Sequence, residues 1–347
     1  MNLKKILLFA IVLIVVVSGV IGWFAYRYIF MPNTNFNQES IHIYIKTDAN
    51  FDDVLSQLKD SLNDAATFEF LAEKRKYASN VKPGHFVIEK GMSNLDIIRT
   101  LRSRNIPIQI RFNNQERIED LAGHIATQIE ADSVSLVFVM QNEAFLSKYE
   151  LTPETALTLF IPNTYELYWN TSASAFVERM ATEYERFWNE TREQKAASIN
   201  LTKTEVYNLA SIVQKETAAI DERPRVAGVY LNRLKRGMLL QADPTVIFAV
   251  KKESNDFDKI IKRVLYKDLE TDSPYNTYKY AGIPPGPIAM PDISSIDAVL
   301  NAEKHDYLYF VADTERLGYH KFSKTLAQHN VYRAQYIRWI NAQRINR

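Results

Sequence analysis

The motifs that the 347-residue chain lacks restrict the chemistry it can perform. It has no cysteine, which excludes disulfides, thiolate nucleophiles and cysteine-based zinc sites. It has no GxSxG or HExxH motif, and its six histidines are scattered without metal-ligand spacing. Its ten glycines form no GxGxxG or Walker loop for a phosphate. We therefore expect no metal and no cofactor, and carboxylate chemistry remains.

Glu216 is the carboxylate whose setting suits acid chemistry. Apolar residues before it recur at helical spacing: Val206, Leu209 and Val213. Glu216 follows three residues later, which places its carboxyl group beside this stripe. Apolar surroundings disfavour the charged form, so the pKa rises and the group can protonate a glycosidic oxygen. Alternatively, Glu216 ends a helix and pairs with Arg223 or Arg225.

Two polar segments are candidates for sugar binding. The first follows a helix and contains Gln241, Asp243 and Thr245, although Asp243 to Thr245 would also suit a helix cap and turn. The second lies in the loop 272–291, whose five prolines forbid a regular helix. Its aromatic and amide side chains suit sugar recognition: Tyr275, Asn276, Thr277 and Tyr278. Each tyrosine could equally be a core residue with a bonded hydroxyl.

The surrounding sequence predicts an α+β protein. Strand-like residues 41–45, 85–88 and 108–112 are each followed by turn and helix signals, which indicates three strand-turn-helix units. After residue 118 the pattern is mainly helical. The expected helices cover 133–141, 174–189, 203–217 and 223–236. A small β element is expected at 307–311.

The N-terminus predicts a membrane anchor. Residues 6–26 form an uncharged apolar run of the length that crosses a bilayer. Lys4 and Lys5 precede it, so we expect the N-terminus in the cytoplasm and the bulk of the chain outside. The alternative is a cleaved signal peptide, but residues 18–22 fit a small-x-small cleavage site poorly. The net charge of +1 gives no reason to expect a nucleic-acid partner.

Three central segments of the chain form a recognisable set: 209–217 (LASIVQKET), 229–234 (VYLNRL) and 240–246 (LQADPTV). Together with segments elsewhere in the chain, they resemble the YceG/MltG family of endolytic transglycosylases. The other segments are 160–165 (FIPNTY), 275–278 (YNTY), 282–285 (GIPP) and the C-terminal 307–311 (YLYFV) with His320 and His329. Residues 84–101 are similar to the LysM-like subdomain of that family.

The resemblance implies a domain organisation and a set of site residues. It implies an anchor at 1–30, a linker at 31–40, a LysM-like α/β subdomain at 41–115 and a mainly helical catalytic domain at 116–347. The catalytic acid would be Glu216, and Asn163 and Tyr165 would join the sugar contacts. The family often has Glu at the position of Gln214, which argues that Gln214 is no required acid. It often has Asp at the position of Asn163, which could still form a hydrogen bond but carries no charge.

The resemblance also implies a mechanism and a cellular role. A lytic transglycosylase protonates the oxygen leaving N-acetylmuramic acid, and the muramyl C6 hydroxyl then closes a 1,6-anhydro ring. One residue can act as acid and then as base. Such an enzyme would end nascent peptidoglycan strands beside synthases at the plasma membrane. The alternatives are a hydrolase of the same bond, using Asp243 or Glu222 as a second carboxylate, and a noncatalytic glycan-binding scaffold.

Overall fold

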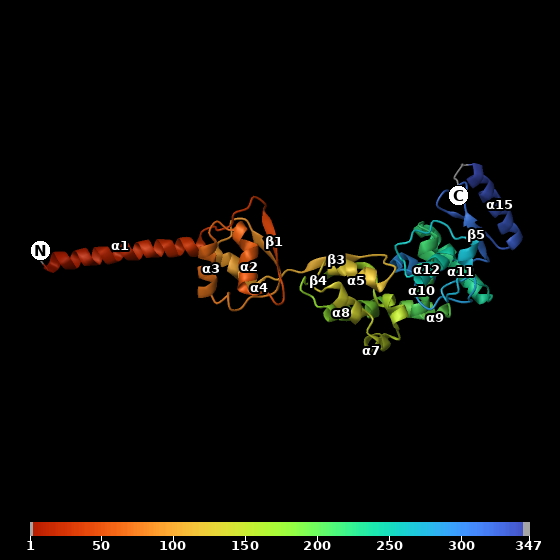
Figure 1. Ribbon diagram of the computed structural model, residues 1–347, viewed down its shortest axis with the longest axis horizontal. Coiled ribbons are helices and arrows are strands. Elements are labelled where there is room, and N and C mark those ends of the chain that lie inside the picture. Colours follow the sequence, from red (N-terminus) through yellow and green to blue (C-terminus); the bar gives the residue numbers. More distant parts are fainter. Residues whose placement is uncertain (1–2, 343–347) are drawn as a thin grey trace. The chain divides into compact units, whose positions relative to one another are not determined.

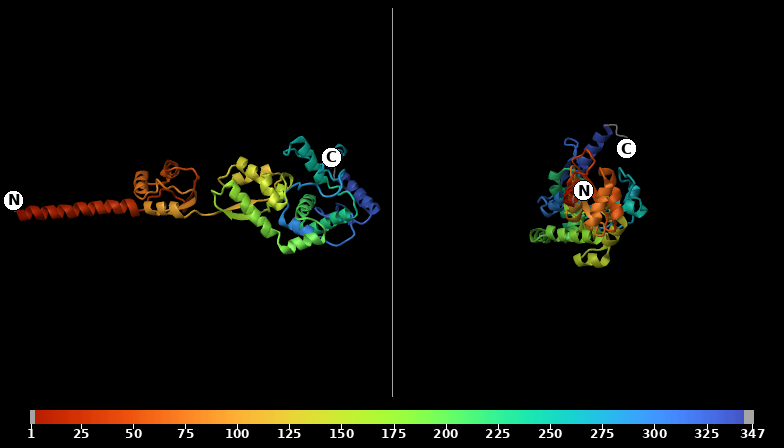
Figure 2. Two further views of the ribbon diagram at one scale, coloured as in Figure 1. Left: turned by 90° about the horizontal axis from the view of Figure 1, so that it is seen from below. Right: turned by 90° about the vertical axis from the view of Figure 1, so that its left-hand side faces the viewer.

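The computed structural model describes residues 3–342 and begins with one long helix, α1 (Leu3–Phe30). This helix, red in Figure 1 and in the left view of Figure 2, has 28 residues and is fully exposed over its apolar run. Its length and composition suffice to cross a membrane, and a signal sequence would meet the same criterion. The predicted N-terminal apolar helix is therefore confirmed.

The rest of the chain divides into two compact units. The first contains residues up to Ile110, together with 128–131 and 165–172, and the second contains the remainder. The elements of the first unit after α1 are β1 (Ser40–Ile45), α2 (Phe51–Leu58), α3 (Ala65–Lys74), β2 (Gly84–Glu89) and α4 (Asn94–Ser103). β1 and β2 pair antiparallel, with Ser40 opposite Glu89 and Ile45 opposite Gly84. Alternate residues of β1, such as Ile43 and Ile45, point into the core beneath the sheet.

The second unit is mainly helical. Its helices are α5 (Ile118–Ala126), α6 (Ser133–Met140), α7 (Glu143–Leu146), α8 (Ala173–Phe187), α9 (Glu190–Ser198), α10 (Lys203–Glu216), α11 (Arg223–Lys235), α12 (Asp243–Ser254), α13 (Tyr266–Leu269), α14 (Ile293–Leu300) and α15 (Leu326–Ala342). Strands β5 (Tyr309–Ala312) and β6 (His320–Ser323) form an antiparallel pair that α15 contacts (Figure 1). β3 (Ile108–Phe112) and β4 (Asn163–Leu167) pair where the chain passes from one unit to the other.

Helix α10 is the central element of the second unit. Thr202 caps its N-terminus and forms a reciprocal capping box with Glu205. The helix packs against α11, α12 and α14. Two of its buried polar side chains also hold the irregular loop 272–291, because Asn208 donates to the carbonyl of Pro284 at 3.1 Å and Ser211 accepts from the amide of Ile288 at 3.1 Å.

The structure confirms the predicted class at a coarse level. Residues 3–342 are mostly helical, with strands in three two-stranded sheets. The four predicted helices agree with α6, α8, α10 and α11 to within two residues at each end. Helix α3 and strand β4 were not predicted, and the third predicted strand pairs with β4 instead of extending the β1–β2 sheet. The likeness of the first unit to LysM and the predicted domain boundaries remain predictions.

Candidate active site

Glu216 is the last residue of α10. Val206, Leu209 and Val213, which precede it on the same face, are fully buried, as their spacing predicted. Thr217 is extended (φ −140°, ψ 133°), so the helix stops directly after Glu216. Glu216 is therefore half-buried at the edge of the core, where α10 ends.

Tyr230 is the hydrogen-bond partner of Glu216. Its hydroxyl donates to Oε1 of Glu216 at 2.7 Å, and the tyrosine side chain is 1% exposed. Tyr230 lies in the middle of α11, which follows α10 after a short turn and has Pro224 in its first turn. Packing of the two helices thus brings together residues 14 positions apart.

The surroundings raise the pKa of Glu216 to about 7, mainly because burial disfavours the carboxylate. The hydrogen bond from Tyr230 opposes this shift, and the negative charge of Asp243 adds to it. His320 and Arg233 have a smaller, lowering effect. The group is therefore poised to hold and release a proton near neutral pH, as the sequence predicted from its apolar setting.

Asp243 and Tyr278 form the second polar pair near Glu216. The Tyr278 hydroxyl donates to Oδ1 of Asp243 at 2.6 Å. Asp243 is the first residue of α12 and is exposed, and Tyr278 comes from the loop 272–291. Burial and this bond raise the pKa of Tyr278, and the negative charge of Glu216 raises it further. The structure thus brings two predicted site residues together beside the acid.

Two basic side chains near Glu216 are fixed by other partners. Arg233 is buried, and its guanidinium donates to the carbonyls of Leu308 and Leu240, both at 2.7 Å. His320 places Nδ1 2.8 Å from Oε2 of Glu222, whose other oxygen accepts from the His320 amide. Because Glu222 is engaged in this way, it has little freedom to act on a substrate.

The arginines proposed as alternative partners of Glu216 bond elsewhere. Arg223 donates to the hydroxyl of Ser294 at 2.7 Å, and Arg225 donates to Glu303 at 2.9 Å. Gln214, two residues before Glu216, has a structural role: its Oε1 accepts from the amide of Asp292, at the start of α14. An amide oxygen serves this purpose without a charge.

The other residues predicted from 241–277 hold the loop together. Thr277 accepts the amide proton of Ala242 at 3.0 Å, and its hydroxyl lies 2.8 Å from that of Thr245. The Asn276 amide donates to the carbonyls of Leu269 and Thr271. Gln241 is exposed, with a left-handed backbone (φ 48°). Sugar contacts by these residues remain predictions.

Three predicted residues are not brought to Glu216 within the second unit. Tyr275 donates to Glu154 at 3.1 Å, in the wall of a separate pocket. Tyr165 is buried in β4 and belongs to the first unit. Asn163, at the start of β4, is exposed, and its amide oxygen accepts from the backbone of Thr164 at 2.8 Å. Their roles in binding remain predictions.

Sequence reasoning missed Tyr230 and Arg233. Both stand in the segment 229–234 that resembles the family motif, so their presence was visible. Their function was not, because only the packing of α10 against α11 brings Tyr230 onto Glu216. A half-buried acid with a raised pKa, a bonded tyrosine and neighbouring Asp243 form a site suited to general acid and base catalysis.

Comparison with known proteins points to one family. The model of the YceG-like family matches residues 43–335. An endolytic murein transglycosylase of Bacillus subtilis (strain 168) is 30% identical over 320 residues, covering 87% of this chain and 86% of that protein. A second, from Streptococcus pneumoniae (strain ATCC BAA-255 / R6), is 25% identical over 84% of this chain, which spans 58% of that relative.

A solved structure extends the likeness to the fold. The crystal structure of a yceG-like protein from Listeria monocytogenes superposes with a TM-score of 0.56 at 28% identity, and the match covers 85% of this chain and 99% of that one. The family model, the relatives and the fold give the same result. The chain belongs to the YceG-like family.

Proposed function

We propose that the protein is an endolytic murein transglycosylase that cleaves the bond between N-acetylmuramic acid and N-acetylglucosamine. The observation that carries this proposal is Glu216, whose half-buried carboxyl group has a pKa of about 7 and accepts a 2.7 Å hydrogen bond from Tyr230. The names of the B. subtilis and S. pneumoniae relatives support the substrate class.

In the first half of the proposed reaction, protonated Glu216 acts as a general acid. It donates its proton to the glycosidic oxygen while the bond from that oxygen to C1 of the muramyl residue breaks. An oxocarbenium-like state develops at C1. Asp243, which raises the pKa of Glu216, helps keep the acid protonated until the sugar arrives.

In the second half, Glu216 acts as a general base. The muramyl C6 hydroxyl attacks C1, and its proton passes to the Glu216 carboxylate, which restores the starting state without consuming water. The hydroxyl belongs to the same sugar, so its attack has the entropic advantage of an intramolecular reaction. The hydrogen bond from Tyr230 and the charges of Arg233 and His320 stabilise the intervening carboxylate.

The proposed location follows from α1. A retained anchor with the N-terminus in the cytoplasm would hold the enzyme where new strands leave the membrane, so that cleavage ends their elongation. Peptidoglycan synthases at the plasma membrane would then be its partners. The length and apolar character of α1 support an anchor, and Lys4 and Lys5 before its apolar run support this orientation.

Product analysis of full-length protein in detergent tests the reaction. Purified glycan strands are incubated with the wild type and with Glu216→Gln, and the released fragments are identified by mass spectrometry. We expect 1,6-anhydro-muramyl ends from internal cuts, lost in the variant by a factor of about 10²–10⁴. Activity that persists in Glu216→Gln would refute Glu216 as the acid.

A hydrolase is the second candidate function, and the presence of a second carboxyl group, that of Asp243, near Glu216 favours it. A carboxylate that acts electrostatically on Glu216 could activate a water molecule instead of leaving the C6 hydroxyl to attack. Reducing ends in the same experiment would establish hydrolysis. If neither protein cleaves but both bind strands, the chain is a noncatalytic scaffold.

A further inference from the structure

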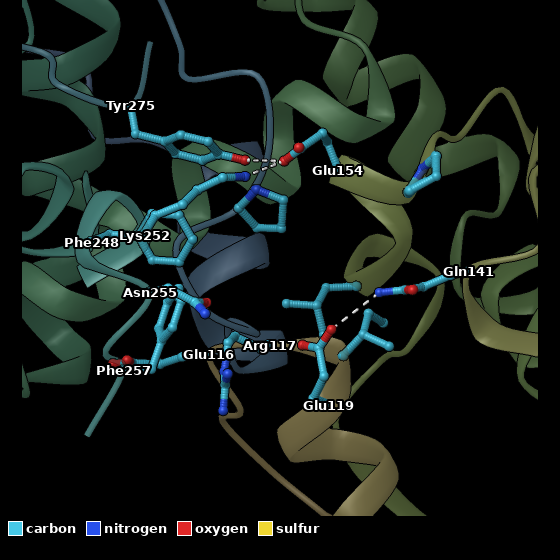
Figure 3. A pocket seen from close by; sticks show the side chains of 14 residues that line it. Glu116, Arg117, Glu119, Gln141, Glu154, Phe248, Lys252, Asn255, Phe257 and Tyr275 are labelled. Atoms are coloured by element: carbon cyan, nitrogen blue, oxygen red, sulfur yellow. Dashed lines mark hydrogen bonds and ion pairs between the residues drawn. The ribbon is translucent and has the colours of Figure 1, made fainter. Parts of the chain in front are cut away.

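The second unit contains a pocket that is distinct from the Glu216 site. Its volume is about 310 Å³, within the range of small-ligand sites. It lies between the start of α5, the end of α6, the segment 153–157 and the second half of α12 (Figure 3). None of the roles proposed above for Glu216 and its neighbours explains this pocket.

One wall of the pocket is aromatic. The rings of Phe248 and Tyr275 lie 4.7 Å apart, and those of Phe248 and Phe257 lie 5.6 Å apart. The Arg117 guanidinium stands over Phe257 at 4.6 Å and the Lys252 ammonium over Tyr275 at 4.9 Å. The wall thus combines apolar surface with two cations, which suits a chain that carries both apolar groups and carboxylates.

Acidic groups lie on two sides of the pocket. Glu154 accepts from Lys252 at 2.6 Å and from Tyr275 at 3.1 Å, while Glu119 accepts from Gln141 at 3.2 Å on the other side (Figure 3). The hydrogen bond from Lys252 lowers the pKa of Glu154, which is therefore ionised at neutral pH. The side chains of the Lys252–Glu154 pair are 38% and 55% exposed, so a ligand can exchange with these contacts at little cost.

The pocket is connected to the catalytic site through α12. Asp243 and Lys252 stand at opposite ends of this helix, nine residues and thus about 14 Å apart along the axis. An extended peptide of about four residues spans about 14 Å. A short peptide attached to a sugar near Asp243 can therefore reach Lys252.

The loop 272–291 provides a second connection. Tyr275 contributes to the pocket wall, and three residues later Tyr278 bonds to Asp243. The absence of a side chain at Gly286 lets the loop pack closely against Tyr275 and Glu154, since a Cβ there would lie 2.6 Å from the Tyr275 hydroxyl and 2.4 Å from the Glu154 carbonyl. A ligand that contacts Tyr275 therefore acts on the same rigid loop that positions Tyr278.

We propose that this pocket binds the peptide stem of murein, with carboxylates of the stem at Lys252 and Arg117 and the amine of its diamino acid at Glu119. This proposal rests on the proposed function for its ligand, because murein peptides are attached to the sugar that Glu216 would act on. Groups of both signs line the pocket, where Lys252 is paired with Glu154 and Arg117 with Asp120, and a zwitterionic chain can exchange with these partly exposed ion pairs better than an uncharged sugar can. With the stem bound in this pocket, the enzyme cleaves strands that carry peptides in preference to bare strands.

The test compares strands with stems against the same strands after an amidase has removed the peptides. The variants are Phe257→Ala and Glu119→Lys, in full-length protein. Matched controls are Phe138→Ala, an exposed phenylalanine of α6, and Glu253→Lys, an exposed glutamate of α12, neither of which lines the pocket. We expect both pocket variants to lose about tenfold in kcat/KM on strands with stems, and to cleave bare strands like the wild type.

The other outcomes overturn the proposal. An equal loss on both substrates would indicate a structural role or a sugar contact, and no loss on either would show that the pocket does not bind the stem. If the wild type cleaves no strand, the proposed function fails, and the pocket is then judged by binding alone. A soluble stem tetrapeptide should bind to the wild type and to Glu216→Gln equally, and to Phe257→Ala about tenfold more weakly.

Discussion

Two glutamates at the end of α10, one in the helix and one bonded to it, have carboxyl groups whose pKa values are shifted in opposite directions. Glu216 ends the helix, and burial raises the pKa of its carboxyl group to about 7. Glu116 contacts the preceding residue: its oxygens accept from Lys215 at 2.8 Å and from Lys251 at 2.9 Å. Burial raises the pKa of Glu116 as well, but the two lysines outweigh it and the net shift is downward.

The difference shows that burial alone does not make a catalytic acid. Both carboxyl groups are partly withdrawn from water, yet only Glu216 is held by a neutral donor, Tyr230, with a carboxylate close by. Glu116 stays ionised and joins α10 to α12. The partner therefore decides whether such a carboxyl group carries a proton or a structural charge.

The largest effect expected from the difference between Glu216 and Glu116 is a strong pH dependence of cleavage, set by the raised pKa of Glu216. Glu216 must be protonated to act as an acid, so kcat/KM should fall about tenfold per pH unit above its pKa of about 7. Between pH 7, where half of the groups are protonated, and pH 9 we expect a loss of about fiftyfold. Initial rates on purified strands measure it. A fall that begins near pH 5 would mean that Glu216 titrates as an ordinary carboxyl group.

The second effect concerns stability. The folded pKa of Glu216 is raised, so the folded protein binds more protons than the unfolded chain between about pH 4.5 and 7, and stability declines as pH rises through that window. Glu216→Gln removes the buried charge and should stabilise the second unit by roughly 2 kcal/mol at pH 8. Denaturant unfolding at pH 8 and pH 4 measures this gain, which should disappear at pH 4.

The sequence predicted helix α10, which carries Glu216, better than it predicted strand β4. Apolar periodicity predicted α10 to within one residue, because this signal is local. Strand β4 was missed since NTYEL has no strong alternation and pairs only with the distant β3. Such pairing depends on contacts far apart in sequence, which local patterns do not encode.

The same distinction applies to the site. The position of Glu216 beside an apolar stripe follows from spacing on one helix, so its raised pKa could be predicted. Tyr230 could not be assigned, because its contact needs two helices and a turn. The sugar contacts of Asn276 and Thr277 remain predictions, but the hydrogen bonds that their side chains make to Leu269, Thr271 and Ala242 could not be predicted, because no local pattern encodes them.

The third prediction removes the neutral donor from Glu216. Tyr230→Phe deletes the hydroxyl that lowers the pKa of Glu216, so the alkaline fall in kcat/KM should move to higher pH. We also expect kcat/KM at its optimum to drop about tenfold, as a bond to a charged group is lost. Tyr207→Phe is the matched control, because this buried tyrosine of α10 bonds the carbonyls of Leu157 and Phe160. Its pH profile should not move.

The smallest effect is expected at Glu116. Glu116→Gln removes the charge that Lys215 and Lys251 share, and it should cost about 1 kcal/mol of stability at pH 7, since these pairs are partly exposed. The pKa of Glu116 is lowered, so this contribution is present above the unfolded pKa and lost as pH falls through the folded one. Unfolding at pH 7 and in acid measures it, and the alkaline fall in kcat/KM should stay in place. A shift of that fall would show that Glu116 also sets the proton affinity of Glu216, and the two carboxyl groups would then be one coupled system.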